Sequence, residues 1–272
     1  MLKKPYTTYD RLFTYHLATR NLPTFEDPDH IGTWAEGGTT ILFFHRAKEK
    51  LVEELCRRSG STLAYKADLD YADWEAGFTP HCFTEQGLTV RPVWERGDAD
   101  LRLDPSVVFG NGFHPSTRLC LRYLLTTIDL GKPRIRTVLD LGCGTGLLSL
   151  AAAVRGAEKV FAFDNNRLAC DVCSTNARRN GLHARVQVVQ ADLFTGFPSV
   201  AADLTVANLH HELLAHLMQQ ETFWHGNHLI LSGFMPSQEE HLLPLVPHDH
   251  FSFLERTRVH KWCLWQLGKH PT

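Results

Sequence analysis

The sequence has little of what marks membrane, secreted or nucleic-acid-binding proteins. Its 272 residues carry a net charge of only −2, so no global field favours nucleic acid or an anionic membrane surface. The first ten residues lack the apolar core of a secretory signal. The apolar segment Leu147–Val154 is far shorter than the roughly 18 residues of a membrane helix. We therefore expect a cytoplasmic protein with neither a membrane nor a direct nucleic-acid partner.

The cysteines are too few and too scattered for a disulfide framework. They number seven, an odd count. Cys170 and Cys173 form a C-x-x-C, but no second pair has the spacing of a zinc site. Both fall on one apolar stripe of a predicted helix, which favours core packing. His211 and His216 are five residues apart, and not the four that align two metal ligands on one helix face. No metal site is expected.

What the chain does have is a glycine-rich turn between an apolar run and an apolar helical segment. The run Val138–Leu141 includes Asp140, and Gly142, Gly144 and Gly146 then stand at alternate positions. This pattern predicts a buried strand, a tight turn and a helix start whose backbone faces a ligand. A dinucleotide fingerprint needs a third glycine where Leu147 stands. An ordinary turn between strand and helix is the simplest alternative.

The D-x-G-x-G-x-G pattern resembles that of class I S-adenosylmethionine (SAM) methyltransferases, in which the glycines admit the methionine part of the cofactor. Asp164 supports this resemblance, because it ends the strand Lys159–Phe163 and follows Gly142 by 22 residues. One carboxylate accepts hydrogen bonds from both hydroxyls of a ribose. A helix cap is an alternative, compatible role for Asp164.

Strands and helices alternate over the C-terminal part of the chain, which predicts an α/β fold with a doubly wound, mostly parallel sheet. The expected strands are Thr137–Leu141, Lys159–Phe163, Arg185–Gln190, Asp203–Ala207 and Asn227–Leu231. The expected helices are Leu147–Arg155, Arg167–Asn180 and Glu212–Glu221. The run Arg256–Leu267 is expected to add an antiparallel edge strand.

The N-terminal part predicts a small α+β domain over residues 1–72. Asp10–Ala18, Thr39–His45 and Ser61–Ala67 favour strands, and Arg46–Arg58 favours an amphipathic helix. Residues 73–103 are expected to form a linker, with Thr84–Asp104 crossing between the two domains. Residues 104–272 are expected to form the cofactor-binding domain.

The segment Asp104–Thr117 reads DPSVVFGNGFHPST. It resembles the D-P-x-x-A-F-G-T-G-x-H-x-T-T signature of PrmA, the bacterial methyltransferase of the eleventh protein of the large ribosomal subunit. The resemblance also includes the segments Asp73-Trp74, Leu139–Gly146, Phe163-Asp164, Asn176–Gly181 and Val206–Leu209. Asn111 and Ser116 depart from the signature, although both keep a polar side chain.

This resemblance implies a ferredoxin-like N-terminal domain that docks a ribosomal protein, and a second domain that trimethylates its amino groups. SAM is then the cofactor and S-adenosylhomocysteine the product. The residues expected to bind the cofactor are Phe109, Gly110, Thr117, Asp140, Gly142, Gly144, Gly146, Asp164 and Asn208. Asn208 is also the expected catalytic residue, orienting the acceptor amine. His114 is given no catalytic role, and His210 and His211 are expected near the acceptor channel.

Two alternatives stay open at this point. One is a SAM-dependent methyltransferase that acts on a different protein or on a small molecule. The other is a SAM-binding or ribosome-interacting protein without enzymatic activity. The N-terminal domain is short and has no motif that matches the resemblance, so the sequence supports the reaction more strongly than it supports the substrate.

Overall fold

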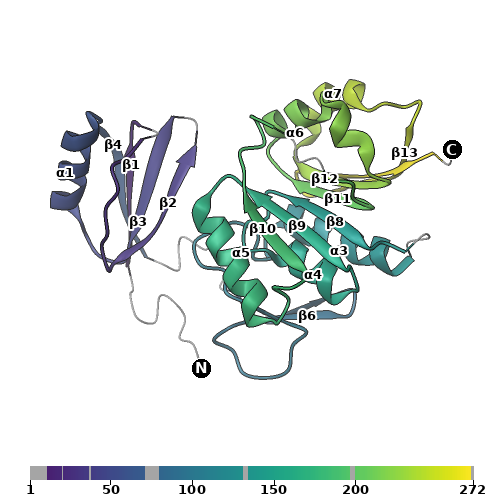
Figure 1. Ribbon diagram of the computed structural model, residues 1–272, viewed down its shortest axis with the longest axis horizontal. Coiled ribbons are helices and arrows are strands. Elements are labelled where there is room, and N and C mark those ends of the chain that lie inside the picture. Colours follow the sequence, from purple (N-terminus) through teal and green to yellow (C-terminus); the bar gives the residue numbers. More distant parts are fainter. Residues whose placement is uncertain are drawn as a thin grey trace. The chain divides into compact units, whose positions relative to one another are not determined.

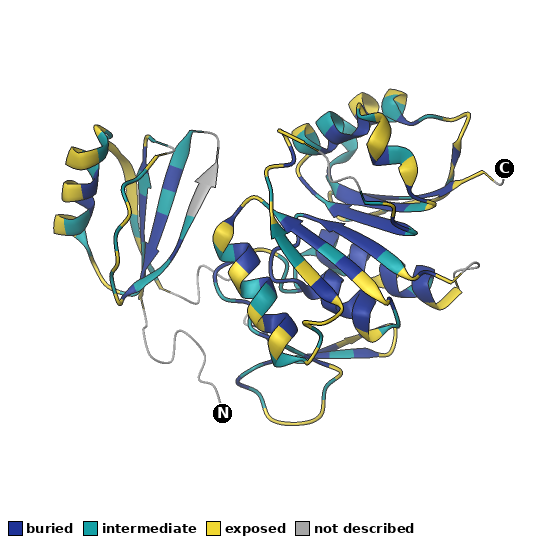
Figure 2. Cartoon of the chain, in the orientation of Figure 1, coloured by how far each residue is buried: buried dark blue, intermediate teal, exposed yellow. Residues whose placement is uncertain are grey.

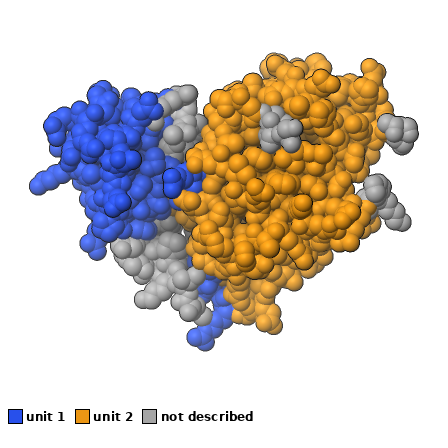
Figure 3. All heavy atoms as spheres, in the orientation of Figure 1, with its two compact units in different colours: residues 1–81, 93–96, 166–168 blue, residues 82–92, 97–165, 169–272 orange. Residues whose placement is uncertain are grey.

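The structure is a computed structural model, and it describes residues 11–19, 21–36, 38–70, 80–130, 134–196 and 200–270. Asp73 and Trp74, which contribute to the family resemblance, lie outside these ranges. The chain divides into two compact units (Figure 3). Unit 1 comprises residues 1–81, 93–96 and 166–168, and unit 2 comprises residues 82–92, 97–165 and 169–272.

Unit 1 is an antiparallel sheet with one helix in the part of the chain that the structure describes. Its strands lie in the order β2 (His30–Glu36), β3 (Thr39–Phe44), β1 (Arg11–Leu17), β4 (Leu63–Asp70). Helix α1 (Glu49–Ser59) ends at Gly60, whose left-handed φ of 67° suits glycine. The core joins the sheet to the apolar face of α1 through Tyr15, Leu17, Leu42, Phe44, Val52 and Leu55.

No sequence pattern predicted β2 or the packing of the stretch that precedes it. Between β1 and β2, the described residues form no helix. Phe25 instead packs on Phe44, with ring centroids 6.2 Å apart. The Lys48 ammonium lies 2.8 Å from carboxylate oxygens of both Asp27 and Asp29. Among the described residues, a segment without regular secondary structure therefore occupies the place in chain order where a βαββαβ arrangement has its first helix.

The larger sheet belongs to unit 2 and, in the described residues, has seven strands (Figure 1). Their order is β10 (Val186–Gln190), β9 (Lys159–Asp164), β8 (Thr137–Leu141), β11 (Leu204–Asn208), β12 (His228–Phe234), β14 (Trp262–Lys269), β13 (Phe251–Val259). The first five strands are mutually parallel, and β14 and β13 are antiparallel additions. The expected α/β fold with a mostly parallel sheet is confirmed.

Helices cover both faces of this sheet, so its central strands are buried (Figure 2). One face packs against α3 (Pro115–Leu130), α4 (Leu147–Val154) and α5 (Arg167–Arg179). The other face packs against α6 (His211–Met218), the 3₁₀ turn η2 (Glu221–His225) and the segment α7 (Pro236–Leu242) with η3 (Leu243–Leu245). Among the described residues, no helix has the length and apolar character of a membrane span.

Two stretches differ from expectation. The run Arg256–Leu267 is not one strand but parts of a hairpin, β13 and β14, which reverses at His260 with a left-handed φ of 54°. Thr84–Asp104, together with Phe83, forms three short strands of unit 2, β5 (Phe83–Glu85), β6 (Leu88–Pro92) and β7 (Leu101–Leu103). They form their own sheet in that order within the described chain. The domain bounds 1–72 and 104–272 stay predictions.

Candidate cofactor and acceptor site

The glycine-rich turn connects β8 to α4 at the carboxyl edge of the parallel sheet. Gly142, Gly144 and Gly146 all have left-handed φ angles, of 77°, 51° and 84°. The Gly142 and Cys143 amides donate to the Phe163 carbonyl at 2.8 and 2.9 Å, which ties the turn to the end of β9. Ligands of open α/β sheets bind at this edge. The turn therefore has the position and backbone conformation of a cofactor site.

The loop Asp104–His114 lies against this turn. The Thr145 amide donates to the Phe109 carbonyl at 3.0 Å, and the Thr145 hydroxyl donates to the Gly110 carbonyl at 2.7 Å. A methyl group at Gly144 would overlap the Phe109 carbonyl oxygen, so only glycine permits this approach. The structure thus brings Phe109 and Gly110 to the turn, and the Phe109 side chain stays 46% exposed.

Asp164 is the last residue of β9 and is half-buried. Its Oδ2 accepts a hydrogen bond from the Gly144 amide at 3.0 Å. The carboxylate is therefore held at the glycine-rich turn, beside the strand end where a ribose diol is expected. This arrangement fits a nucleoside cofactor, because a carboxylate accepts hydrogen bonds from two neighbouring hydroxyls.

Asp140 has a different setting, because it is only 1% exposed. Its Oδ2 accepts a hydrogen bond from the Ser149 hydroxyl at 2.5 Å, which joins β8 to α4. Burial raises the pKa of Asp140 to about 7, and the Ser149 hydroxyl offsets only part of this effect. Asp140 thus links the strand before the turn to the helix after it. Its direct contact with a cofactor stays a prediction.

Asn208 and Thr117 are 91 residues apart in sequence and adjacent in space. The Asn208 side-chain amide donates to the Thr117 hydroxyl at 3.2 Å. Asn208 ends β11 and is half-buried, whereas Thr117 lies in the first turn of α3 and is 1% exposed. The next residue, Leu209, has its side chain against Gly142. The pair therefore lies at the same sheet edge as the glycine-rich turn.

With this geometry in place, similarity to known proteins decides the family. Residues 44–270 match the family described as ribosomal protein L11 methyltransferase (PrmA). This chain belongs to that family. Its membership confirms the resemblance, the class I methyltransferase fold and the methyltransferase class of enzyme that the sequence predicted.

Individual relatives agree with this assignment. A ribosomal protein L11 methyltransferase of Alteromonas mediterranea is 33% identical over 82% of this chain and 79% of its own length. One from Pelotomaculum thermopropionicum is 36% identical over 64% of this chain, which spans only 58% of that relative's length. A crystal structure of the ribosomal protein L11 methylase of Lactobacillus delbrueckii subsp. bulgaricus is 25% identical, covers 70% of this chain and 97% of its own, and has a TM-score of 0.58.

An aromatic contact joins the family signature to β14, and no sequence pattern predicted it. The His114 ring lies between Phe109 and Trp262, with centroid distances of 5.0 and 4.7 Å. Burial and the charge of Lys261 lower the pKa of His114, which favours the neutral imidazole. Trp262 starts β14 just after the hairpin turn, and no sequence motif marks it. His114 still receives no catalytic role.

The histidines after Asn208 serve local structure. His210 caps α6 by accepting from the Leu213 amide at 3.4 Å and lies 3.0 Å from Glu212. His211 Nδ1 lies 2.8 Å from the Gln238 side-chain amide. Among the described residues, no cluster of three metal-ligating side chains occurs. That His210 and His211 line an acceptor channel stays a prediction.

Three of the buried cysteines lie in the glycine-rich turn or on α5. Cys143, Cys170 and Cys173 are buried, in keeping with the packing interpretation of the C-x-x-C pair. A hydrogen bond with Cys173 and burial raise the pKa of Cys143, and burial raises the pKa of Cys170 to about 12. Buried thiols with raised pKa values are unreactive.

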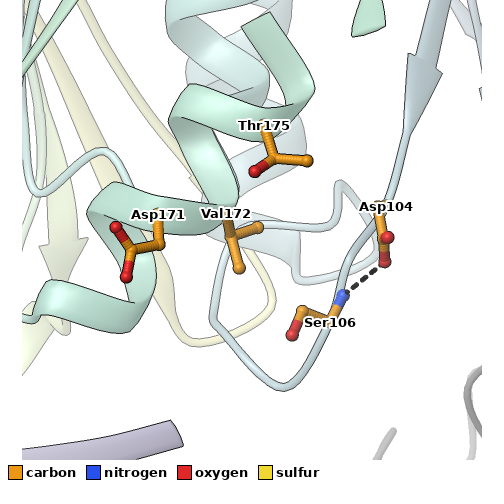
Figure 4. A pocket seen from close by; sticks show the side chains of 5 residues that line it. All are labelled: Asp104, Ser106, Asp171, Val172 and Thr175. Carbon is orange, nitrogen blue, oxygen red and sulfur yellow. Dashed lines mark hydrogen bonds between the residues drawn. The ribbon is translucent and has the colours of Figure 1, made fainter. Parts of the chain in front are cut away.

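An open hollow of about 160 Å³ lies between α5 and the loop after β7 (Figure 4). It is lined by Asp104, Ser106, Asp171, Val172 and Thr175. The Ser106 amide donates to Asp104 at 3.1 Å, which shapes one wall. None of the residues predicted to bind the cofactor lines this hollow, so it is separate from the candidate site.

Proposed function

We propose that this chain transfers methyl groups from SAM to amino groups of ribosomal protein L11. The observation that carries the proposal is the hydrogen bond between Asn208 and Thr117 at the same sheet edge as the glycine-rich turn, in a chain of the PrmA family. The choice of L11 as substrate rests on the names of the relatives. The choice of methyl transfer to an amine rests on the arrangement of the site residues.

The residues present fit SAM, which would supply an electrophilic methyl group when bound. Asp164 would accept hydrogen bonds from the ribose hydroxyls, since its carboxylate is already oriented by the Gly144 amide. Gly142 and Gly144 would receive the methionine part along the backbone of the turn, where side chains are absent. Phe109 and Gly110 would border the cofactor from the loop.

Asn208 would orient the acceptor amine. Its Nδ2 donates to Thr117, which leaves the carbonyl Oδ1 to accept an N–H of the substrate. Alignment of the nitrogen behind the methyl carbon is catalysis by orientation. Presenting a lysine as a neutral amine near pH 7.4 costs about 4 kcal/mol, given its ordinary pKa of about 10.4. Exclusion of water around the substrate ammonium lowers this cost.

The direct test uses purified protein, unmethylated L11 and SAM with a deuterated methyl group. Mass spectrometry of L11 peptides should show labelled methyl groups on lysine side chains or on the amino terminus. L11 whose amino groups have been chemically blocked is the control and should remain unlabelled. If SAM binds and intact L11 gains no label, L11 is not the substrate.

A second candidate is a methyltransferase of the same family that acts on a different protein. The observation in its favour is that the family match begins at residue 44, so β1, β2 and most of β3 lie outside it. Labelling a bacterial extract with the same SAM distinguishes the two candidates. Label in L11 supports the first, and label in another protein, with none in L11, supports the second.

A further inference from the structure

Two asparagines, Asn176 on α5 and Asn180 directly after its last residue, bind the backbone of the strand that leads into the family signature. The Arg102 amide donates to Asn180 Oδ1 at 2.8 Å, and Asn180 Nδ2 donates to the Arg102 carbonyl at 2.8 Å. The Asp104 amide donates to Asn176 Oδ1 at 3.0 Å, and Asn176 Nδ2 donates to the Asp104 carbonyl at 2.9 Å. Each side chain thus pairs with one residue as a neighbouring strand would.

These contacts occur where β7 has no strand beside it. In the described chain, β7 is an edge strand of its three-stranded sheet, and β6 pairs with it on one side only. Residues 102 and 104 alternate along the extended chain. Asn180 follows the last residue of α5, and its backbone amide donates to the Asn176 carbonyl at 3.1 Å, so the two asparagines keep the four-residue spacing of a helix. The two amides therefore continue the hydrogen bonding of the sheet edge and fix the start of the loop Asp104–His114 against α5, along the hollow of Figure 4.

Only one of the two asparagines also reaches the glycine-rich turn. Asn176 Nδ2 donates to the Thr145 carbonyl at 3.0 Å, whereas the other contact of Asn180 is to the Asn176 carbonyl within α5. Thr145 in turn donates to Phe109 and Gly110. Asn176 and Thr145 are both 0% exposed. Removing the Asn176 amide would leave buried backbone groups without partners, which is costly.

We propose that Asn176 is a positioning residue for cofactor binding. It holds the turn Gly142–Gly146 and the loop that begins at Asp104 in one fixed relation through Thr145, whereas Asn180 only secures the strand. This inference rests on the proposed function, because it takes SAM as the ligand of the turn. Asn176 touches neither cofactor nor substrate and acts through Thr145.

Asn176→Ala and Asn180→Ala form a matched pair for the test, because each removes one side-chain amide that bonds to the backbone of the segment Arg102–Asp104. We would titrate S-adenosylhomocysteine by calorimetry into the parent and both variants, each well below its unfolding temperature. Asn176→Ala should weaken binding by about tenfold or more, the loss expected for one buried hydrogen bond of about 1.4 kcal/mol. Asn180→Ala should change binding by less than about threefold.

A second readout needs no ligand. Hydrogen exchange of the Thr145 amide, which is bonded to the Phe109 carbonyl, should be faster in Asn176→Ala and unchanged in Asn180→Ala. If Asn176→Ala does not fold, Asn176→Asp replaces it, because it keeps the size and the Oδ1 acceptor and loses the Nδ2 donor. The same two measurements then apply.

The outcomes separate the inference from the proposed function. A parent protein that binds no S-adenosylhomocysteine contradicts the proposed function. If the parent binds it and the residue 176 variants bind equally well, the positioning role is overturned and the function stands. Equal losses at positions 176 and 180 would also overturn it, because they would show a general structural effect.

Discussion

Asp164 is the residue whose removal should affect cofactor binding most directly. Asp164→Ala deletes both the proposed ribose acceptor and the partner of the Gly144 amide. Charge-assisted hydrogen bonds contribute about 1.5–3 kcal/mol each, so SAM affinity should fall by well over about tenfold. Calorimetry measures this. The control is Asp171→Ala, which removes an exposed acid from α5. Unchanged SAM affinity in Asp164→Ala would show that Asp164 does not belong to the site.

Asn208 should matter for turnover more than for affinity. Asn208→Ala removes the proposed carbonyl acceptor for the amine and the contact with Thr117. Misplacement by about 1 Å can cost on the order of a hundredfold in rate, so single-turnover methyl transfer at saturating SAM should slow to that extent.

Thr117→Val provides the comparison for Asn208→Ala, since it keeps the Asn208 side chain and removes only the hydroxyl that receives its hydrogen bond. It should produce a smaller loss of rate than Asn208→Ala. A rate for Asn208→Ala that equals the parent rate would reject the orienting role, even if a binding titration showed weaker affinity.

At the scale of elements, the close approach of loop and turn requires glycine. Gly144 and Gly181 both have left-handed φ angles, of 51° and 67°. A methyl group at Gly144 would overlap the Phe109 carbonyl, whereas one at Gly181 would meet nothing within 4 Å. Each substitution to alanine should lower the free energy of unfolding by about 1–2 kcal/mol through backbone strain.

Gly144→Ala should additionally displace the loop and weaken S-adenosylhomocysteine binding, and Gly181→Ala should leave binding intact. Thermal unfolding and calorimetry on the two variants distinguish strain from displacement. Equal affinity in both variants would mean that the loop does not border the cofactor.

At the scale of the whole molecule, the two units should divide recognition from chemistry. A fragment of residues 73–272 retains every residue proposed to bind SAM, since all of them follow Asp104. It should bind SAM with an affinity close to that of the full chain and fail to methylate intact L11. Calorimetry and mass spectrometry give the two answers, and a melting curve verifies that the fragment is folded. Full activity of the folded fragment on L11 would contradict the docking role of the N-terminal domain.

The sequence by itself determined the centre of the larger sheet and its glycine-rich turn. The strands β8, β9 and β11 and the turn glycines follow from apolar runs and from backbone requirements that act over a few residues. Asp164 and Asn208 could be placed for the same reason, because each ends a predicted strand at the carboxyl edge. The family signature added Phe109, Gly110 and Thr117, which have no local pattern of their own.

Only the tertiary structure decided which of these residues meet. Asn208 and Thr117 are 91 positions apart, and Asn176 and Asp104 are 72 apart. The short strands β5 to β7 and the hairpin of β13 and β14 also escaped prediction, since pairing and packing partners set such elements more than propensity does. A side-chain amide that completes a strand edge, as Asn176 and Asn180 do, depends on how a helix packs against a distant segment. Local sequence does not encode which distant segment a helix will pack against, so the contacts of Asn176 with the glycine-rich turn appear only once the chain is folded.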